Sequence, residues 1–151
     1  MIELEVEKRL GGFRLEARFT APGAGITALF GRSGAGKTSI VNMLAGLLRP
    51  DRGRISVGGE NLFSSADGID LPPERRRLGY IFQEGRLFPH YSVRGNLTYG
   101  AGRPDRAIGF DAVVALLGLG PLLERRPGDL SGGEKQRVAI GRALLASPRL
   151  L

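Results

Sequence analysis

The feature that most constrains the fold of this chain is a glycine-rich octapeptide between an apolar run and a helical pattern. Residues 31–38 read GRSGAGKT and match the pattern G-x-x-x-x-G-K-[ST]. The preceding residues 26–30, ITALF, form a compact apolar run that predicts a buried β-strand. The following apolar residues recur at helical spacing: Ile40, Val41, Leu44, Leu47 and Leu48. A strand, a glycine-rich loop and a helix in this order are typical of a phosphate-binding loop.

The residue types in this loop suit a polyphosphate ligand. Glycines let the backbone amides approach phosphate oxygens without a Cβ in the way, and a helix N-terminus adds partial positive charge. We expect Lys37 to reach the β- and γ-phosphates and the Thr38 hydroxyl to fill part of a Mg²⁺ shell. A plain strand-to-helix turn is the alternative, which the flanking pattern disfavours. The predicted nucleotide contacts are Gly31, Arg32, Ser33, Gly34, Ala35, Gly36, Lys37, Thr38 and Ser39.

Composition is that of a globular protein, with 151 residues, 42% hydrophobic and 25% charged. The absence of cysteine excludes disulfides and thiolate metal sites. The longest apolar stretch, residues 112–123, is too short to span a membrane, and the N-terminus does not resemble a signal peptide. The net charge of +7 would suit nucleic acid or anionic lipid, but the basic residues are scattered, which favours a solvated surface. We expect a protein that is soluble or docked on a membrane partner.

The remaining patterns predict two kinds of structure. Alternation in residues 2–6 and 13–19 predicts an antiparallel hairpin, residues 54–57 a short strand, and residues 78–82 a buried strand that ends at Gln83. Two prolines at 72–73 predict a short basic helix. After Gln83 the patterns predict loops and helices, with Ser92 capping a short helix and residues 110–117 forming another. Residues 149–151 have the pattern of the first residues of a further strand.

The stretch DLSGGEKQR, from residue 129, opens the last predicted helix. Ser131 and Glu134 have the S-x-x-E form of a capping box, and the helix is expected to run to Leu145 with Val138, Ala139, Leu144 and Leu145 on its apolar side. On this reading alone, Ser131 is a cap and the glycines at 132 and 133 form a turn. Such an N-terminus, with glycine amides and a hydroxyl, would also receive an anion well.

A phosphate loop, a strand-ending glutamine and LSGGE in this order resemble the ATP-binding subunits of ABC transporters over essentially the whole chain. The resemblance implies an α/β fold: a P-loop NTPase core of the ABC type, with an N-terminal antiparallel hairpin and an inserted helical subdomain. It divides the chain into an ATP-binding core (1–83), the helical subdomain (84–147) and the start of a truncated strand (148–151).

The same resemblance implies the ligands and their residues. ATP and Mg²⁺ are expected, with Thr38 and Gln83 as Mg²⁺ contacts and Lys37, Gln83 and Ser131 as catalytic residues. In the family two subunits form a head-to-tail dimer, so that Ser131, Gly132 and Gly133 of one subunit would face the ATP of the other.

The segments ALFGRSGAGKTS, RRLGYIFQ, RLFPHYSVRGNLTYG and LSGGEKQRVAIGRALL are most similar to the ATPases of molybdate importers. This similarity implies coupling of ATP hydrolysis to uptake of an oxyanion. The partners would be membrane permease subunits and, indirectly, a periplasmic oxyanion-binding protein, and the subunit would be peripheral on the cytoplasmic face of the bacterial inner membrane. Phe88, Pro89 and Tyr91 would contact the permease, with core packing as the alternative, and His90 would be structural.

Two departures from the family pattern stand out. The tyrosine that often stacks on adenine is missing near the end of the first strand, where Leu10 or Phe13 would substitute. The acidic strand end with its aspartate and catalytic glutamate, the switch histidine and the C-terminal regulatory domain are also missing. We therefore expect a fragment of a longer protein, truncated before the Walker B strand, that binds ATP without hydrolysing it.

Other functions remain open at this point. One alternative within transport is the ATPase of a different importer, for sulfate, iron or a sugar. Another alternative is that the chain is only a nucleotide-binding fragment. A DNA-maintenance ATPase of the ABC type is the alternative from another class. Such proteins separate the phosphate loop from the signature by long coiled-coil arms, whereas here the span from Thr38 to Ser131 is short and lacks heptads. No nucleic-acid partner is therefore expected.

Overall fold

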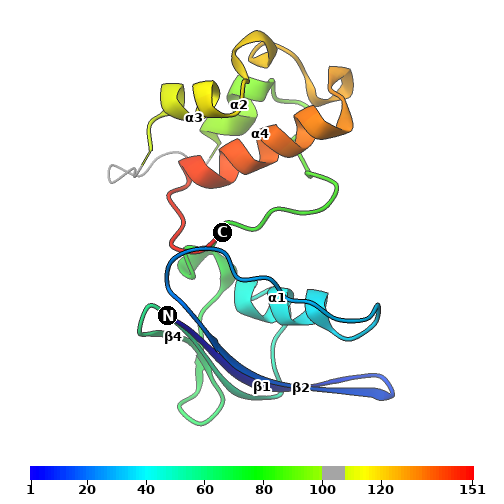
Figure 1. Ribbon diagram of the computed structural model, residues 1–151, viewed down its shortest axis with the longest axis vertical. Helices are drawn as coiled ribbons and strands as arrows, with labels where there is room; N and C mark the ends of the chain where they lie inside the picture. Colours follow the sequence, from blue (N-terminus) through cyan, green and yellow to red (C-terminus); the bar gives the residue numbers. More distant parts are fainter. Residues whose placement is uncertain (100–107) are drawn as a thin grey trace. The chain divides into compact units, whose positions relative to one another are not determined.

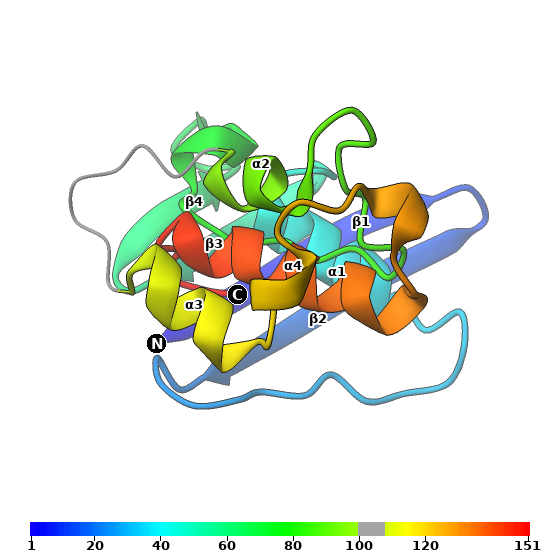
Figure 2. The same cartoon turned by 90° about the horizontal axis from the view of Figure 1, so that it is seen from above.

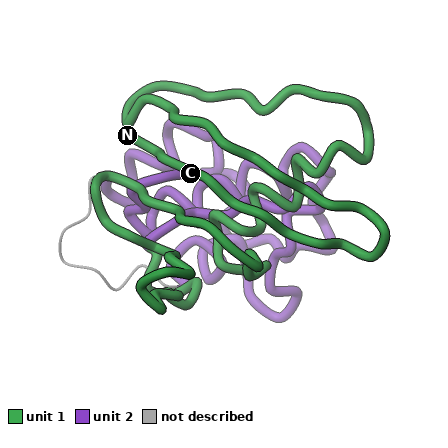
Figure 3. The backbone as a smooth tube through the Cα atoms, turned by 90° about the horizontal axis from the view of Figure 1, so that it is seen from below, with its two compact units in different colours: residues 1–76 green, residues 77–151 purple. Residues whose placement is uncertain are grey.

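The structure of the protein is a computed structural model that describes residues 1–99 and 108–151. Residues 100–107, part of the predicted helical subdomain, lie outside the described residues. The chain forms two compact units, Met1–Arg76 and Arg77–Leu151, which Figure 3 distinguishes by colour. Each unit has its own packing and is described separately below.

The first unit is built on an antiparallel five-stranded sheet with the order β2-β1-β3-β4-β5 (Figure 1). Its strands are β1 (Ile2–Leu10), β2 (Phe13–Ala21), β3 (Arg52–Val57), β4 (Glu60–Ser64) and β5 (Ile69–Asp70). The predicted hairpin is confirmed, with Ile2 opposite Ala21 and Leu10 opposite Phe13. The predicted strand at 54–57 is confirmed as part of β3, whereas β4 and β5 were not predicted.

Alternation in β1 separates a core face from a charged face. Ile2, Leu4 and Val6 are buried, and Leu4 lies opposite Ile55 of β3. The intervening glutamates are exposed, and Arg14 of β2 pairs with Glu7 across the strands. Helix α1 (Lys37–Ala45) lies over the sheet (Figure 1 and Figure 2) and buries Met43 and Ala45. The core of this unit therefore lies between α1 and the apolar face of the sheet.

The predicted strand at 26–30 is wrong. These residues have no strand structure, and the side chains of Ile26 and Phe30 are fully exposed. A buried parallel strand needs hydrogen-bonded neighbours on its edges and helices on its faces, and no described strand pairs with this run. An apolar run therefore indicates what a segment can become, but its neighbours decide whether the strand forms.

Two helix ends in this unit also differ from the sequence prediction. Helix α1 stops at Ala45, before Leu47 and Leu48, because Gly46 takes a left-handed conformation at φ 78° and its amide bonds back to the last turn. The short basic helix predicted from the prolines at 72–73 is a single 3₁₀ turn, η1 (Pro73–Arg75).

The second unit is helical. Its elements are α2 (Val93–Thr98), α3 (Phe110–Leu116), α4 (Gly132–Leu145) and the 3₁₀ turns η2 (Gly120–Leu122) and η3 (Pro127–Asp129). Helices α2 and α3 both pack against α4. Gly141 of α4 permits a close approach, because a Cβ there would lie 2.8 Å from Leu97 Cδ2. Eight buried residues form the core of this unit: Val93, Leu97, Val113, Leu119, Leu122, Leu130, Val138 and Leu145.

The helix predictions for this unit are confirmed, but the strand at 78–82 is not. Ser92 caps α2 by accepting a hydrogen bond from the Gly95 amide, and α4 buries Val138, Ala139 and Leu145 as expected. The run 78–82 is not a strand; Leu78 forms one isolated parallel bridge with Leu150. The Gly79 amide donates to the Leu150 carbonyl at 2.9 Å. Residues 149–151 thus begin a parallel pairing without completing a ladder.

Candidate phosphate-binding site

Residues 31–36 form an irregular loop that leads into α1. Two of its glycines adopt the left-handed region, Gly34 at φ 80° and Gly36 at φ 89°. Space around Gly34 is open, whereas a Cβ on Gly36 would collide with Cδ1 of the buried Leu15. Position 36 therefore requires glycine for two reasons: its left-handed backbone conformation and its close packing against β2. As the N-cap, Gly36 is also the residue at which α1 begins.

Lys37, the first residue of α1, folds back over the loop. Its Nζ donates hydrogen bonds to the carbonyls of Gly31 and Arg32, each at 2.8 Å. An ammonium group has three donors, so one remains for another acceptor. Because Gly31 and Arg32 are exposed, that donor is within reach of a ligand at the loop.

The N-terminus of α1 is prepared for an anion. Its N-cap is Gly36, with no side-chain cap hydrogen bond, and its first turn contains no acidic residue. The first amides of a helix have no intrahelical partner and carry the positive end of the helix dipole. Thr38 is exposed and Ser39 half-buried at this same end. The residues present therefore fit a phosphate group, through amides, an ammonium and a hydroxyl.

The signature stretch begins α4 with a complete capping box. The Ser131 Oγ accepts from the Glu134 amide at 3.3 Å, and the Ser131 amide donates to Glu134 Oε2 at 2.7 Å. The hydrogen bond from the Ser131 backbone is the largest cause that lowers the pKa of Glu134. The side-chain hydrogen bond between the Ser131 hydroxyl and the Glu134 carboxylate is the next cause that lowers this pKa, so both ends of the capping box are paired within α4.

Gly132 and Gly133 have no structural reason within the described residues to be glycine. Neither lies at positive φ, both are exposed, and a Cβ on either would meet nothing within 4 Å. A glycine that neither conformation nor packing requires still leaves its amide open to close approach by another molecule. This observation favours a ligand-facing role over a simple turn.

Gln83 lies in an exposed turn, where the Gly85 amide donates to the Phe82 carbonyl at 3.0 Å. This turn packs against the signature helix α4 at Gly85. A Cβ on Gly85 would lie 3.4 Å from the carbonyl oxygen of Lys135. Gln83 and the start of α4 thus belong to the second unit, and the phosphate loop belongs to the first.

Two polar residues that the sequence analysis missed organise the segment after Gln83. The Arg142 guanidinium of α4 donates to the carbonyls of Gly85 and Arg86, at 3.4 and 3.0 Å. Asn96, fully buried in α2, accepts from the Phe88 amide at 2.8 Å and donates to the Phe88 carbonyl at 3.1 Å. In the sequence, Asn96 and Arg142 each fall on the apolar side of a predicted helix, and a polar residue there indicates a buried hydrogen bond.

Aromatic side chains cluster on this segment. The rings of Phe88 and Tyr99 lie 4.3 Å apart, and those of His90 and Tyr91 4.4 Å apart. Phe88 is half-buried, Pro89 is exposed, and Tyr91 is 39% exposed. The cluster thus combines internal packing with an open aromatic surface.

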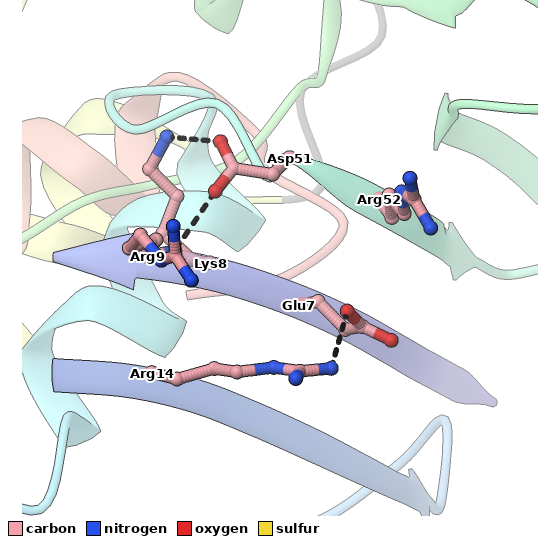
Figure 4. A pocket seen from close by; sticks show the side chains of 6 residues that line it. All are labelled: Glu7, Lys8, Arg9, Arg14, Asp51 and Arg52. Carbon is pink, nitrogen blue, oxygen red and sulfur yellow. Dashed lines mark hydrogen bonds and ion pairs between the residues drawn. The ribbon is translucent and has the colours of Figure 1, made fainter.

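A hollow of about 370 Å³ lies at one end of the hairpin in the first unit (Figure 4). Figure 4 shows Lys8 Nζ and the Arg9 amide pointing at the two carboxylate oxygens of Asp51, at 2.7 and 2.8 Å. The hydrogen bond from Lys8 is the largest cause that lowers the pKa of Asp51. Because both carboxylate oxygens are satisfied from β1, this cluster ties β1 to the chain that enters β3.

No group of three or more His, Asp or Glu side chains that would hold a metal occurs in 1–99 and 108–151. None of the helices described in these ranges is long and apolar enough to cross a membrane.

Comparison with known proteins gives the family. Residues 16–151 match the ABC transporter family. The chain belongs to the ABC transporter family. The resemblance noted from the phosphate loop, Gln83 and the signature is thereby confirmed.

Within the ABC transporter family, curated relatives are similar over the whole chain. A protein named molybdenum import ATP-binding protein ModC from Paramagnetospirillum magneticum is 64% identical over 100% of this chain and 42% of its own length. Proteins of the same name from Rhodospirillum rubrum and Shewanella sp. strain MR-7 are 62% and 58% identical, each over 100% of this chain and 41% of their length. The chain thus spans about two fifths of the length of these relatives.

Solved structures of ABC proteins share the fold. One, described as the ATP-binding subunit of an ABC transporter, is 28% identical with a TM-score of 0.78 and covers 97% of this chain and 62% of that one. The ATP-binding cassette MJ0796, in a dimeric post-hydrolysis state, has a TM-score of 0.76 at 23% identity, over 98% of this chain and 71% of its own. The predicted fold class, an ABC ATPase core with an antiparallel hairpin and a helical insertion, is confirmed.

Proposed function

We propose that this chain is the N-terminal part of the ATP-binding subunit of an ABC importer that takes up an oxyanion, molybdate. The observation that carries the ATP-binding part is the loop at 31–38, with its uncapped helix N-terminus and the Lys37 ammonium on the loop backbone. The substrate assignment is supported by 58–64% identity to relatives named for molybdenum import. ATP hydrolysis by the full-length protein would drive the uptake.

Each loop residue has a distinct task in this proposal. The amides of the loop and of the first turn of α1 bind the β- and γ-phosphates, and the free donor of Lys37 adds a charged hydrogen bond. Thr38 would contribute its hydroxyl oxygen to Mg²⁺, which would neutralise phosphate charge when bound. The remaining magnesium ligands would be phosphate and water oxygens, which Mg²⁺ accepts readily.

Phe13 is the residue that we assign to adenine. One edge of its ring, Cε1, lies 3.7 Å from the position a Cβ on Gly36 would take, and its side chain is 44% exposed. An exposed aromatic face beside the phosphate loop is suited to stacking on a base. Leu10, half-buried at the end of β1, supports the same end of the hairpin without offering a π-face.

The signature acts on the nucleotide of a second copy in a head-to-tail dimer. The Ser131 hydroxyl and the open amides of Gly132 and Gly133 would form an anion receptor at the N-terminus of the 14-residue helix α4. Lys37 and the partner's Ser131 would together stabilise the charge that develops on the γ-phosphate. In the full-length protein a carboxylate would orient the attacking water.

Permease subunits would dock on the aromatic segment after Gln83. Pro89 and Tyr91 are exposed there, and the ring of Phe88 lies 5.8 Å from that of Tyr91. The buried Asn96 bonds to the backbone of Phe88 on both its amide and its carbonyl. Aromatic side chains with one open face are enriched at protein interfaces. The subunit would thus sit on the cytoplasmic face of the bacterial inner membrane, and the periplasmic binding protein would be only an indirect partner.

Nucleotide binding is tested with Lys37→Ala. We expect isothermal titration of the full-length protein with Mg·ATP to give binding that Lys37→Ala removes. Arg18→Ala, which deletes one positive charge at an 82% exposed position in β2, is the matched control and should bind normally. Equal binding by Lys37→Ala and the control would contradict the assignment of the loop.

The substrate is tested in cells. A strain that lacks the gene should lose molybdate uptake at nanomolar to micromolar supply and recover it with the wild-type gene but not with Lys37→Ala. Uptake of sulfate, iron and sugars should not change in the same strain. Loss of one of those activities with normal molybdate uptake would assign the subunit to a different importer.

A further inference from the structure

Arg76 is the largest fully buried side chain in the described part of the protein, with 1% of its surface exposed. Its guanidinium donates four hydrogen bonds to partners in the first unit. Nη1 donates to the carbonyls of Met43 and Leu44 at 2.7 and 2.9 Å, and Nε donates to the carbonyl of Leu71 at 2.6 Å. Nη2 donates to Asp70 at 3.2 Å. Arginine is rarely fully buried unless its charge is paired, because burial removes the charge from water.

The carbonyls of Met43 and Leu44 belong to the last turn of α1, which leads away from the phosphate loop. The last carbonyls of a helix have no intrahelical partner, and they form the negative end of its dipole. A buried cation is therefore favourable at this end. The planar fork of an arginine can bond two neighbouring carbonyls and a third acceptor at once, whereas a lysine ammonium is a point charge on a flexible stem.

Gly46 makes this contact possible. It lies at φ 78°, and a Cβ there would be 2.7 Å from Nε and 2.9 Å from Cζ of Arg76. The C-cap glycine thus does more than reverse the chain, because it also opens the space in which the guanidinium lies against the helix end.

Both buried side chains of α1 lie toward this end of the helix. Only Met43 and Ala45 of the helix are buried, and the residues of the first turn are exposed or half-buried. A nine-residue helix is a rod about 13 Å long, so a small tilt at its C-terminus displaces its N-terminal amides by an ångström or so. Misplacement on that scale weakens a preorganised site markedly.

We propose that Arg76 is a positioning residue for the phosphate loop: it anchors the last turn of α1 and so sets where Lys37 and the N-terminal amides lie. This inference rests on the proposed nucleotide binding by the loop. It does not require Arg76 to touch the ligand. The bonds to two helix carbonyls and the space at Gly46 are the observations that carry it.

The test compares Arg76→Lys and Gly46→Ala with Gly68→Ala in the full-length protein. Gly68 also has positive φ, at 68°, but a Cβ there meets nothing within 4 Å, so its variant measures backbone strain alone. Dissociation constants are measured for Mg·ATP and for Mg·tripolyphosphate, at a temperature where circular dichroism reports each variant as folded. Tripolyphosphate isolates the phosphate contacts from those of adenine.

Arg76→Lys and Gly46→Ala should each raise both dissociation constants about tenfold, equivalent to about 1.4 kcal/mol, while Gly68→Ala leaves them within about twofold. Phe13→Ala should weaken ATP but not tripolyphosphate, which separates an adenine defect from a phosphate defect. Variants that unfold at lower temperature yet keep both constants would overturn the positioning role and leave a purely structural one.

Should Arg76→Lys not fold, the pair Gly46→Ala and Gly68→Ala decides, because both carry the strain of positive φ and only Gly46→Ala meets Arg76. A wild-type protein that binds neither probe would contradict the proposed function itself. Normal wild-type binding with unchanged variants would contradict the role of Arg76 alone.

Discussion

Replacing Gly36 with alanine tests the geometry that starts α1. The new Cβ faces two obstacles. At φ 89° a residue with a side chain is strained, and the Cβ would collide with Leu15 Cδ1, while Leu15 Cγ lies 3.3 Å away. Leu15 is 3% exposed, so it has little room to move aside.

The magnitude follows from these two terms. Strain of an alanine in the left-handed region costs about 1 kcal/mol, and overpacking against a buried side chain costs about 1–3 kcal/mol. Gly36→Ala should therefore lower the free energy of unfolding by about 2–4 kcal/mol. Gly34→Ala, at φ 80° with open space around its Cβ, should cost only about 1 kcal/mol.

The assay is urea unfolding of the full-length protein followed by circular dichroism. The overpacking share is isolated by repeating Gly36→Ala in a Leu15→Ala background, which removes the colliding atoms. In that background we expect the cost of Gly36→Ala to fall to about 1 kcal/mol, leaving a coupling of about 1–3 kcal/mol. Equal costs for Gly34→Ala and Gly36→Ala, or no coupling to Leu15, would refute the packing argument.

Three further predictions concern the second unit. Ser131→Arg should leave ATP binding by the monomer nearly unchanged and abolish ATP-dependent dimerisation measured by gel filtration; equal loss of monomer binding would favour a plain cap, worth about 1 kcal/mol. Because the pKa of Glu134 is lowered in the folded protein, its capping hydrogen bond stabilises the fold at pH values above the ordinary pKa of 4.5. This stabilisation is lost as the pH falls through the lower pKa of the folded state. Glu134→Gln should therefore make the free energy of unfolding depend less on pH in the acid range. A cysteine at the exposed Pro89 should cross-link to a cytoplasmic loop of the permease in the assembled transporter, and a cysteine at Arg18 should not; the reverse pattern would refute the docking surface.

Local patterns in the sequence predicted several features whose structure is locally determined. Alternation of apolar and acidic residues predicted the hairpin, and the side chains of Ser92 and Ser131 predicted the starts of α2 and α4. The loop at 31–38 could be picked out as a candidate, because its glycines, lysine and threonine recur at a fixed spacing, and its binding of phosphate stays a prediction. In each case the interacting groups lie within a few residues or on adjacent strands.

Non-local features escaped the sequence analysis. The run at 26–30 is apolar enough for a buried strand, but a parallel strand exists only through hydrogen bonds to neighbours distant in sequence. Among residues 1–99 and 108–151, parallel pairing is limited to one bridge, between Leu78 and Leu150. The short strands β4 and β5 likewise depend on pairing with β3 rather than on a strong pattern of their own.

The sequence by itself determined the caps and the family and singled out the candidate phosphate loop, since these rest on residue types at fixed spacing. Only the tertiary structure decided that Arg76 lies against the end of α1, that Gly36 lies on Leu15, and that Gly132 and Gly133 face open space. An arginine in a basic run and a glycine in a loop look the same in a sequence whether they are exposed or enclosed. Their roles depend on which distant atoms the folded chain brings within contact, because hydrogen bonds and steric contacts act over only a few ångströms.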